Sequence, residues 1–138
     1  MTMYHASIYR FDEFAKLPCF TDEPDAALPY LNGHAGYLYT VEIDEDALVV
    51  AGERTVRRIA AELGLDAECV WELLEDEPEV REALKERGYN AAEYTDLGPD
   101  NLYEHYTLML LDPSLARIVA VDEVQEHQGV MLEIGRAH

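Results

Sequence analysis

The sequence predicts an α+β fold in a single domain over residues 1–138. Segments with strand-like patterns occupy both ends of the chain, and helical patterns fill the middle. The connections between them are too irregular for repeated βαβ units, which favours α+β over α/β. Because 49% of the 138 residues are hydrophobic, the chain is long enough and apolar enough to bury a substantial core.

The first third of the chain predicts four strands and one helix. Residues 2–8 are expected to form the first strand and residues 17–21 a short second one. Asp22 is a suitable N-cap for a helix with Pro24 in its first turn, and Pro29 is expected to end or kink that helix just before Tyr30. Strict alternation predicts a half-buried strand at 37–43, and an apolar run predicts a short strand at 48–51.

The middle of the chain predicts three helices, and the remainder predicts strands. Apolar residues at helical spacing mark the inward face of each helix, while glycines mark the stops of the first and third helices. Asp66 is expected to cap the second helix and Asp76, with Pro78 near the first turn, to start the third. Further strands are expected at 89–95, 105–111, 117–121 and 129–134.

Charge and composition narrow the classes of partner. Ten basic residues against 29 acidic ones give a formal charge of −19, which argues against direct binding to nucleic acid because that mode needs clustered Lys and Arg. An acidic surface is attracted to basic proteins instead; the alternatives are a merely soluble protein, or one from a salt-rich or acid-biased proteome. No membrane span or signal peptide is expected, which suggests a cytoplasmic protein. Cys19 and Cys69 suggest buried thiols in a reducing compartment, and no His/Cys metal spacing is present.

His5 and Tyr30 are the first candidates for a ligand site. His5 has the small neighbours Ala6 and Ser7, which allow a ligand to approach the backbone closely; the alternative is a structural histidine bonded to a nearby carbonyl. Tyr30 follows a proline at an expected helix end, where an exposed aromatic ring can stack on a planar cation such as oxidised nicotinamide. Tyr37 and Tyr39 sit in an alternating strand and are expected to pack in the core.

Three carboxylates and one arginine complete the candidates drawn from residue pattern. Glu93 and Asp96 end an apolar strand and lead into a loop, and Glu104 opens the next strand, so the three are expected to face one cleft. A fixed negative charge of this kind stabilises the oxocarbenium-like state in which a nicotinamide–ribose bond breaks. For each of them the alternative is an ordinary solvated surface acid. Arg10 is the natural countercharge for a pyrophosphate near the first strand.

Taken in order, these segments resemble the ADP-ribosyltransferase superfamily, with a closer similarity to its type I-F anti-CRISPR members. The resemblance is carried by four short motifs: Tyr4-His5-Ala6-Ser7, Phe20-Thr21-Asp22-Glu23-Pro24 leading to Tyr30, Gly88-Tyr89-Asn90-Ala91-Ala92-Glu93-Tyr94 with Asp96, and Thr107-Leu108-Met109-Leu110-Leu111-Asp112-Pro113. It implies a split β-sheet core with a helical insert, and NAD as the substrate.

The resemblance also implies roles for individual residues. His5 would contact a ribose, Tyr30 would stack on the nicotinamide, and Asp96 would be the catalytic carboxylate. The other residues implied in NAD binding are Tyr4, Ser7, Phe20 and Thr21. Many transferases of this fold carry a glutamate where this chain has Thr107, so either Asp96 or Glu104 takes that role, or the protein only binds.

These observations predict an NAD-dependent ADP-ribosyltransferase that modifies a basic, nucleic-acid-binding protein in a bacterial host cytoplasm, such as a CRISPR surveillance complex. One alternative is a non-catalytic acidic decoy that blocks a basic groove of its partner by charge alone. Another is an ADP-ribosylating toxin or a module that binds ADP-ribose without transferring it.

Overall fold

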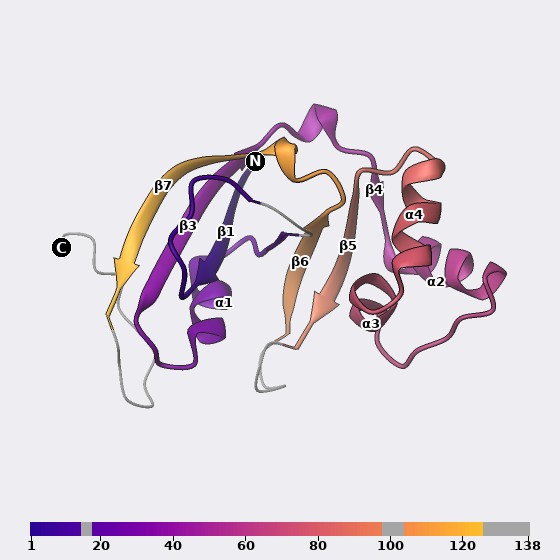
Figure 1. Cartoon of the computed structure of the whole chain (residues 1–138), viewed down its shortest axis with the longest axis horizontal. Helices are drawn as coiled ribbons and strands as arrows, with labels where there is room; N and C mark the ends of the chain where they lie inside the picture. Colours follow the sequence, from indigo (N-terminus) through magenta and orange to yellow (C-terminus); the bar gives the residue numbers. More distant parts are fainter. Residues whose placement is uncertain (15–17, 98–103, 126–138) are drawn as a thin grey trace.

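The strands form two sheets in the computed structural model, which describes residues 1–14, 18–97 and 104–125. The first sheet has the order β1-β3-β7, all antiparallel, and the second has the order β2-β6-β5-β4, antiparallel except for β4 beside β5. The two sheets lie next to one another in Figure 1. The strands are β1 (Thr2–Ser7), β2 (Cys19–Phe20), β3 (Gly36–Ile43), β4 (Val50–Ala51), β5 (Ala91–Asp96), β6 (His105–Leu110) and β7 (Ala116–Val124).

A single backbone bridge joins the two sheets within the described residues. Tyr4 and Thr21 exchange both of their N–H···O bonds, at 2.8 and 2.9 Å. The chain therefore leaves the first sheet at the end of β1 and returns beside it to start the second. Together with the helices, this arrangement confirms the predicted α+β class.

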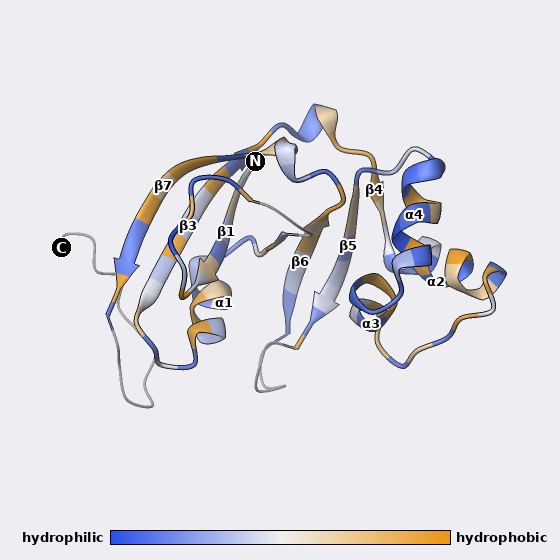
Figure 2. Ribbon diagram, viewed as in Figure 1, coloured by the Kyte–Doolittle hydropathy of each residue, from blue (hydrophilic) through white to orange (hydrophobic). Residues whose placement is uncertain are grey.

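The helices divide between the sheets. Helix α1 (Pro24–Ala27) and the 3₁₀ turn η1 (Leu28–Leu31) contact β1, whereas α2 (Glu53–Glu62), α3 (Val70–Glu75) and α4 (Pro78–Glu86) pack together beside the second sheet (Figure 1). Hydrophobic and hydrophilic residues alternate along α4 in Figure 2, as expected for a helix with one buried face. Two further 3₁₀ turns are η2 (Glu45–Ala47) and η3 (Pro113–Leu115).

Three hydrophobic clusters define the faces of the sheets. The helical face of the second sheet packs against α2, α3 and α4 through Ala92, Tyr94 and Met109. Its opposite face, which carries Phe20, Leu108 and Leu110, shares a cluster with Met3, Val41 and Ile43 of the first sheet. The other face of the first sheet, with Tyr4, Ala6 and Leu38, is covered by Ala27, Leu28 and Leu31.

The helices begin at residues other than the predicted caps. Helix α1 has Glu23 rather than Asp22 as its N-cap, and α3 has Cys69 rather than Asp66. The Asp66 carboxylate instead accepts a hydrogen bond from the N–H of Ala67, at 2.9 Å. Asp and Asn favour tight turns as strongly as helix caps, so the residue type alone did not locate the helix start.

Other boundaries agree more closely with the sequence. The first helix was predicted to end or kink at Pro29; α1 ends slightly earlier, at Ala27, and the 3₁₀ turn η1 that follows has Pro29 in its first turn. The third predicted helix begins at Pro78, with Glu77 as its N-cap, and Asp76 belongs to the end of α3. The strand predicted at 129–134 lies outside the described residues. No helix in the described ranges combines the length and apolar character needed to cross a bilayer.

Candidate functional site

Tyr30, Asp96, His105 and Thr107 form a hydrogen-bonded group, called here the Tyr30 cluster. The Tyr30 hydroxyl donates to Oδ2 of Asp96 at 3.1 Å and lies 3.0 Å from Nε2 of His105. On the other side of the imidazole, Nδ1 lies 3.2 Å from the Thr107 hydroxyl. Tyr30 and Asp96 were predicted from two separate local patterns, and their side chains are in contact although 66 residues of chain separate them.

Strand register places the two residues of the second sheet. Asp96 is the last residue of β5 and pairs directly with His105, the first residue of β6, so their side chains stand next to one another on the same face. Tyr94 of β5 and Thr107 of β6, another directly opposed pair, continue that face toward the helices. The N–H of Leu97 donates to Oδ1 of Asp96 at 2.7 Å, so both carboxylate oxygens are held.

The 3₁₀ turn η1 presents Tyr30 to this pair. Leu28 and Leu31 are buried against the first sheet, which turns the intervening Tyr30 away from that core. The Tyr30 ring meets the His105 imidazole edge to face, with centroids 5.8 Å apart, and retains 40% of its surface exposed. The site therefore lies where the Tyr30 side chain of η1 reaches the end of β5 and the start of β6.

Burial and the charge of Asp96 favour the protonated, neutral forms of three neighbouring groups: Tyr30, Glu75 and Cys19. Burial, followed by the Asp96 charge, raises the pKa of Tyr30, so this phenol keeps its hydrogen at neutral pH. Burial raises the pKa of Glu75, at the end of α3, and the charges of Asp96 and Asp76 raise it further. Burial also raises the pKa of the Cys19 thiol to about 12, and its Sγ lies 3.7 Å from the Tyr94 hydroxyl. Cys19 is thus a protonated, unreactive thiol.

The His5 side chain points away from the Tyr30 cluster, into a group of aromatic rings. Its Nδ1 lies 2.8 Å from the carbonyl of Cys19, and its ring is surrounded by the aromatic rings of Phe11, Phe14, Phe20 and Tyr39. Burial lowers its pKa. This is the structural alternative raised for His5: a neutral ring bonded to a backbone carbonyl.

His5 and Asp96 do not converge, although both were predicted to contact bound NAD. The His5 ring contacts Phe20, whose cluster occupies the face opposite α2, α3 and α4, whereas Asp96 shares its face with Tyr94 of the helical side. Glu93 lies on the same face as Phe20, where its carboxylate accepts a 2.7 Å hydrogen bond from the Tyr106 hydroxyl. Because successive strand residues alternate, Glu93 and Asp96 point to opposite faces.

The remaining predicted residues are dispersed. Glu104 is exposed immediately before β6, and the Arg10 guanidinium pairs with Asp12 at 3.3 Å. The Ser7 hydroxyl accepts from the N–H of Tyr9, and the Thr21 hydroxyl donates to the carbonyl of Glu23.

Two of these residues pack in cores. Phe20 is fully buried, which leaves it no surface for a ligand in this conformation. Tyr4 packs half-buried against the cluster under α1. Both residues shape the fold around the first strand and lie outside the Tyr30 cluster.

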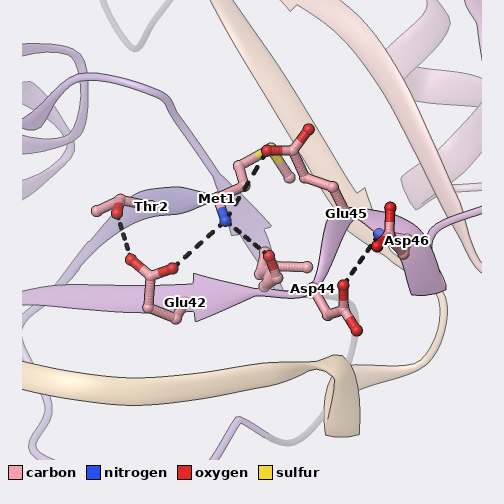
Figure 3. Close-up of polar contacts among 7 residues, drawn as sticks. Met1, Thr2, Glu42, Asp44, Glu45 and Asp46 are labelled. Carbon is pink, nitrogen blue, oxygen red and sulfur yellow. Dashed lines mark hydrogen bonds and ion pairs between the residues drawn. The ribbon is translucent and has the colours of Figure 1, made fainter.

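A second polar group surrounds the N-terminus. The ammonium of Met1 lies 3.3 Å from a Glu42 carboxylate oxygen and 3.9 Å from one of Glu45, and Thr2 donates to Glu42 (Figure 3). The Asp44 carboxylate caps η2 by accepting from the N–H of Asp46. These carboxylates line an open depression of about 670 Å³ together with Arg117. Their contacts are structural ones, and no residue of this group was predicted to bind a ligand.

His105 and Thr107 belong to the site although neither was predicted as a site residue. Alternation along 105–111 does place both side chains on one face, but only the register of β5 on β6 puts that face beside Asp96. Within residues 1–14, 18–97 and 104–125, no group of three or more His, Cys, Asp or Glu side chains is arranged to hold a metal ion.

The Tyr30 cluster combines a fixed carboxylate, a partly exposed aromatic ring and a buried imidazole in one place. Such a group can stabilise a developing positive charge and orient a planar ring beside it. Comparisons of this chain with protein-family models, with curated protein sequences and with solved structures give no match.

Proposed function

We propose that this chain is an NAD-dependent ADP-ribosyltransferase in which Asp96 is the catalytic carboxylate and Tyr30 orients the nicotinamide. The observation that carries the proposal is the 3.1 Å hydrogen bond between the Tyr30 hydroxyl and Asp96. The pairing joins the two groups that the chemistry requires, an aromatic surface for the leaving ring and a negative charge for the sugar.

Each group fits its part of the reaction. The bond between the ribose C1′ and the nicotinamide nitrogen breaks, and its electron pair neutralises the pyridinium. Positive charge develops on the sugar, where an oriented carboxylate stabilises it. Asp96 is held by hydrogen bonds to both of its oxygens, so it does not need to reorganise as that charge develops. An acceptor then forms the new bond at C1′ and loses a proton.

His5 has a supporting part in this proposal. Its bond to the Cys19 carbonyl ties β1 to β2 and so fixes the strand that brings Cys19 to Tyr94 on the helical face. The proposal therefore rests on Asp96 and Tyr30. The expected acceptor is a basic nucleic-acid-binding protein, such as a CRISPR surveillance complex, because the formal charge of −19 favours encounter with such a surface.

The first test is the release of nicotinamide from NAD. Asp96→Asn removes the charge but preserves the shape, and we expect the rate to fall about 10²–10³-fold, the usual cost of losing one oriented electrostatic group. Glu86→Gln on α4 is the matched control, because it removes one exposed carboxylate away from the Tyr30 cluster. Equal rates for Asp96→Asn and the parent would contradict the proposed role of Asp96.

The acidic charge also favours a second candidate, a decoy that occupies a basic groove without catalysis. Salt separates the two candidates. Binding by charge alone weakens steeply as ionic strength rises, because exposed charges are screened over about 8–10 Å at 0.1–0.15 M salt. A covalent ADP-ribose adduct on the partner survives a high-salt wash and adds mass to it.

A further inference from the structure

We infer that His105 is a positioning residue that, held by Thr107, donates a hydrogen bond to Tyr30 and thereby directs the Tyr30 hydroxyl hydrogen to Asp96. The inference deepens the proposed function, and its link to catalysis rests on that proposal. The hydrogen-bond direction itself does not depend on it and can be measured separately.

Counting hydrogens fixes the direction of the hydrogen bonds. A phenol has one hydrogen, and a carboxylate oxygen can only accept. The Tyr30 hydroxyl lies within hydrogen-bond distance of both Asp96 Oδ2 and His105 Nε2, at 3.1 and 3.0 Å. Both contacts can be hydrogen bonds at the same time only if Tyr30 donates to Asp96 and Nε2 of His105 carries a hydrogen and donates it to the Tyr30 oxygen.

Thr107 favours that form of the imidazole. In a neutral ring with hydrogen on Nε2, Nδ1 is an acceptor, and the Thr107 hydroxyl at 3.2 Å can donate to it. The carbonyl of Tyr106 also lies 3.2 Å from Nδ1, and it competes by favouring a hydrogen on that nitrogen. The Thr107 hydroxyl therefore weights the choice between two tautomers.

The choice of tautomer determines where the Tyr30 hydrogen goes. With hydrogen on Nε2, the donors run in one direction, from Thr107 to His105 to Tyr30 to Asp96. With hydrogen on Nδ1 instead, Nε2 becomes an acceptor that competes with Asp96 for the phenol hydrogen. Hydrogen bonds in such a chain polarise one another, so the first arrangement strengthens the bond that holds the Asp96 carboxylate.

Tyr30 needs a hydrogen bond from His105 to fix the orientation of its hydroxyl, because its own packing is loose. Tyr30 sits on a four-residue 3₁₀ turn and is 40% exposed, so local packing alone constrains its phenol weakly. His105 and Thr107 are 8% and 3% exposed and belong to a central strand of the second sheet. The rigid pair therefore fixes the position of the more exposed ring.

The test compares Thr107→Val with Thr107→Ser. Valine has nearly the shape of threonine but no hydroxyl, whereas serine keeps the donor to Nδ1. The ring ¹⁵N chemical shifts of His105 report the tautomer directly. We expect the parent and Thr107→Ser to show hydrogen on Nε2 and not on Nδ1 at pH 8, and Thr107→Val to shift toward the form with hydrogen on Nδ1.

A second measurement on the same three proteins, the rate of nicotinamide release from NAD, tests the effect on catalysis. We expect Thr107→Val to lower kcat about 5–50-fold with KM within about twofold of the parent, and Thr107→Ser to restore kcat to within about threefold, because only the orienting donor is lost and NAD-binding surfaces are untouched. A merely structural role for Thr107 would change the two variants' thermal stability without this split.

His105→Gln provides a second, independent variant. Glutamine can still donate to Tyr30 through its amide, so it is expected to retain more activity than His105→Leu. The inference is overturned if the parent carries hydrogen on Nδ1 only, or if Thr107→Val leaves both the His105 shifts and kcat unchanged. If the parent releases no nicotinamide, the proposed function fails, and the ¹⁵N shifts alone then decide the hydrogen-bond direction.

Discussion

His5 joins the first two strands through its ring, and its burial makes the stability of the protein depend on pH. The folded state lowers the pKa of His5 below its ordinary value of 6.5 because the ring is buried, although the bond to Cys19 opposes this shift. A histidine with a lowered folded pKa contributes stability that is present above its unfolded pKa and is lost as pH falls through the folded value. His5 is thus expected to destabilise the fold on mild acidification.

His5→Gln tests this expectation, because glutamine keeps a donor for the Cys19 carbonyl but does not titrate. At pH 7.5 the variant is expected to be less stable by about 1 kcal/mol, the usual cost of an imperfect replacement in a packed site. Urea unfolding at pH values from 7.5 to 5 should show this difference narrowing as the parent loses the His5 contribution. Parallel stability curves for the two proteins would show that His5 does not titrate as a buried neutral ring.

Among the elements, the η1 turn is held in place by a close contact with a glycine of β3. A Cβ atom on Gly36 would lie 2.7 Å from Cδ2 of Leu31 and 2.7 Å from the carbonyl oxygen of Ser7. The second of these is a backbone atom of β1, which cannot move without disturbing the β1–β3 pairing. Gly36 therefore allows η1 to pack closely on the first sheet, in the position from which Tyr30 reaches Asp96.

Gly36→Ala is expected to destabilise the protein by about 1–3 kcal/mol, as overpacking of a well-packed site does. Gly52→Ala is the control, because the Cβ it would add meets no atom within 4 Å beyond Gly52 and its two chain neighbours. We expect a loss below about 1 kcal/mol from its N-cap position. Chemical denaturation of both variants measures the difference. Equal losses would mean that the contact with Leu31 and Ser7 does not limit the packing of η1.

The helices show which features of an element the residue pattern predicts and which it does not. The apolar spacing of Val56, Ile59, Ala60 and Leu63 predicted α2, because a helix with one buried face must repeat every 3.6 residues. The first three side chains are buried, whereas Leu63 is the C-cap residue and is 44% exposed. The predicted cap residues did not mark the helix starts: Asp66, for example, accepts a hydrogen bond from the N–H of its neighbour Ala67 in the loop before α3. A carboxylate near a helix start has several backbone donors within reach, and the sequence does not indicate which one it takes.

In the molecule as a whole, some residues of the candidate site could be predicted from the sequence, but the contacts that bring them together could not. Tyr30 and Asp96 could be selected because an exposed aromatic residue after a proline and an acid at a strand end are local features. His105 could not, because its place beside Asp96 depends on the register of β6 on β5. The separation of His5 from Asp96 follows from how the two sheets share their hydrophobic clusters, which is set by contacts between segments far apart in the sequence.

The position of bound NAD is the central question, and backbone amide chemical shifts during an NAD titration answer it most directly. We expect the largest changes at residues of the Tyr30 cluster and at Leu97, whose N–H holds Asp96. In Asp96→Asn the site's shape is retained, so changes should remain centred there even where catalysis is lost. Changes centred instead on His5 and Glu93, on the acidic depression near Met1, or nowhere in the described part of the chain would contradict the assignment of this site.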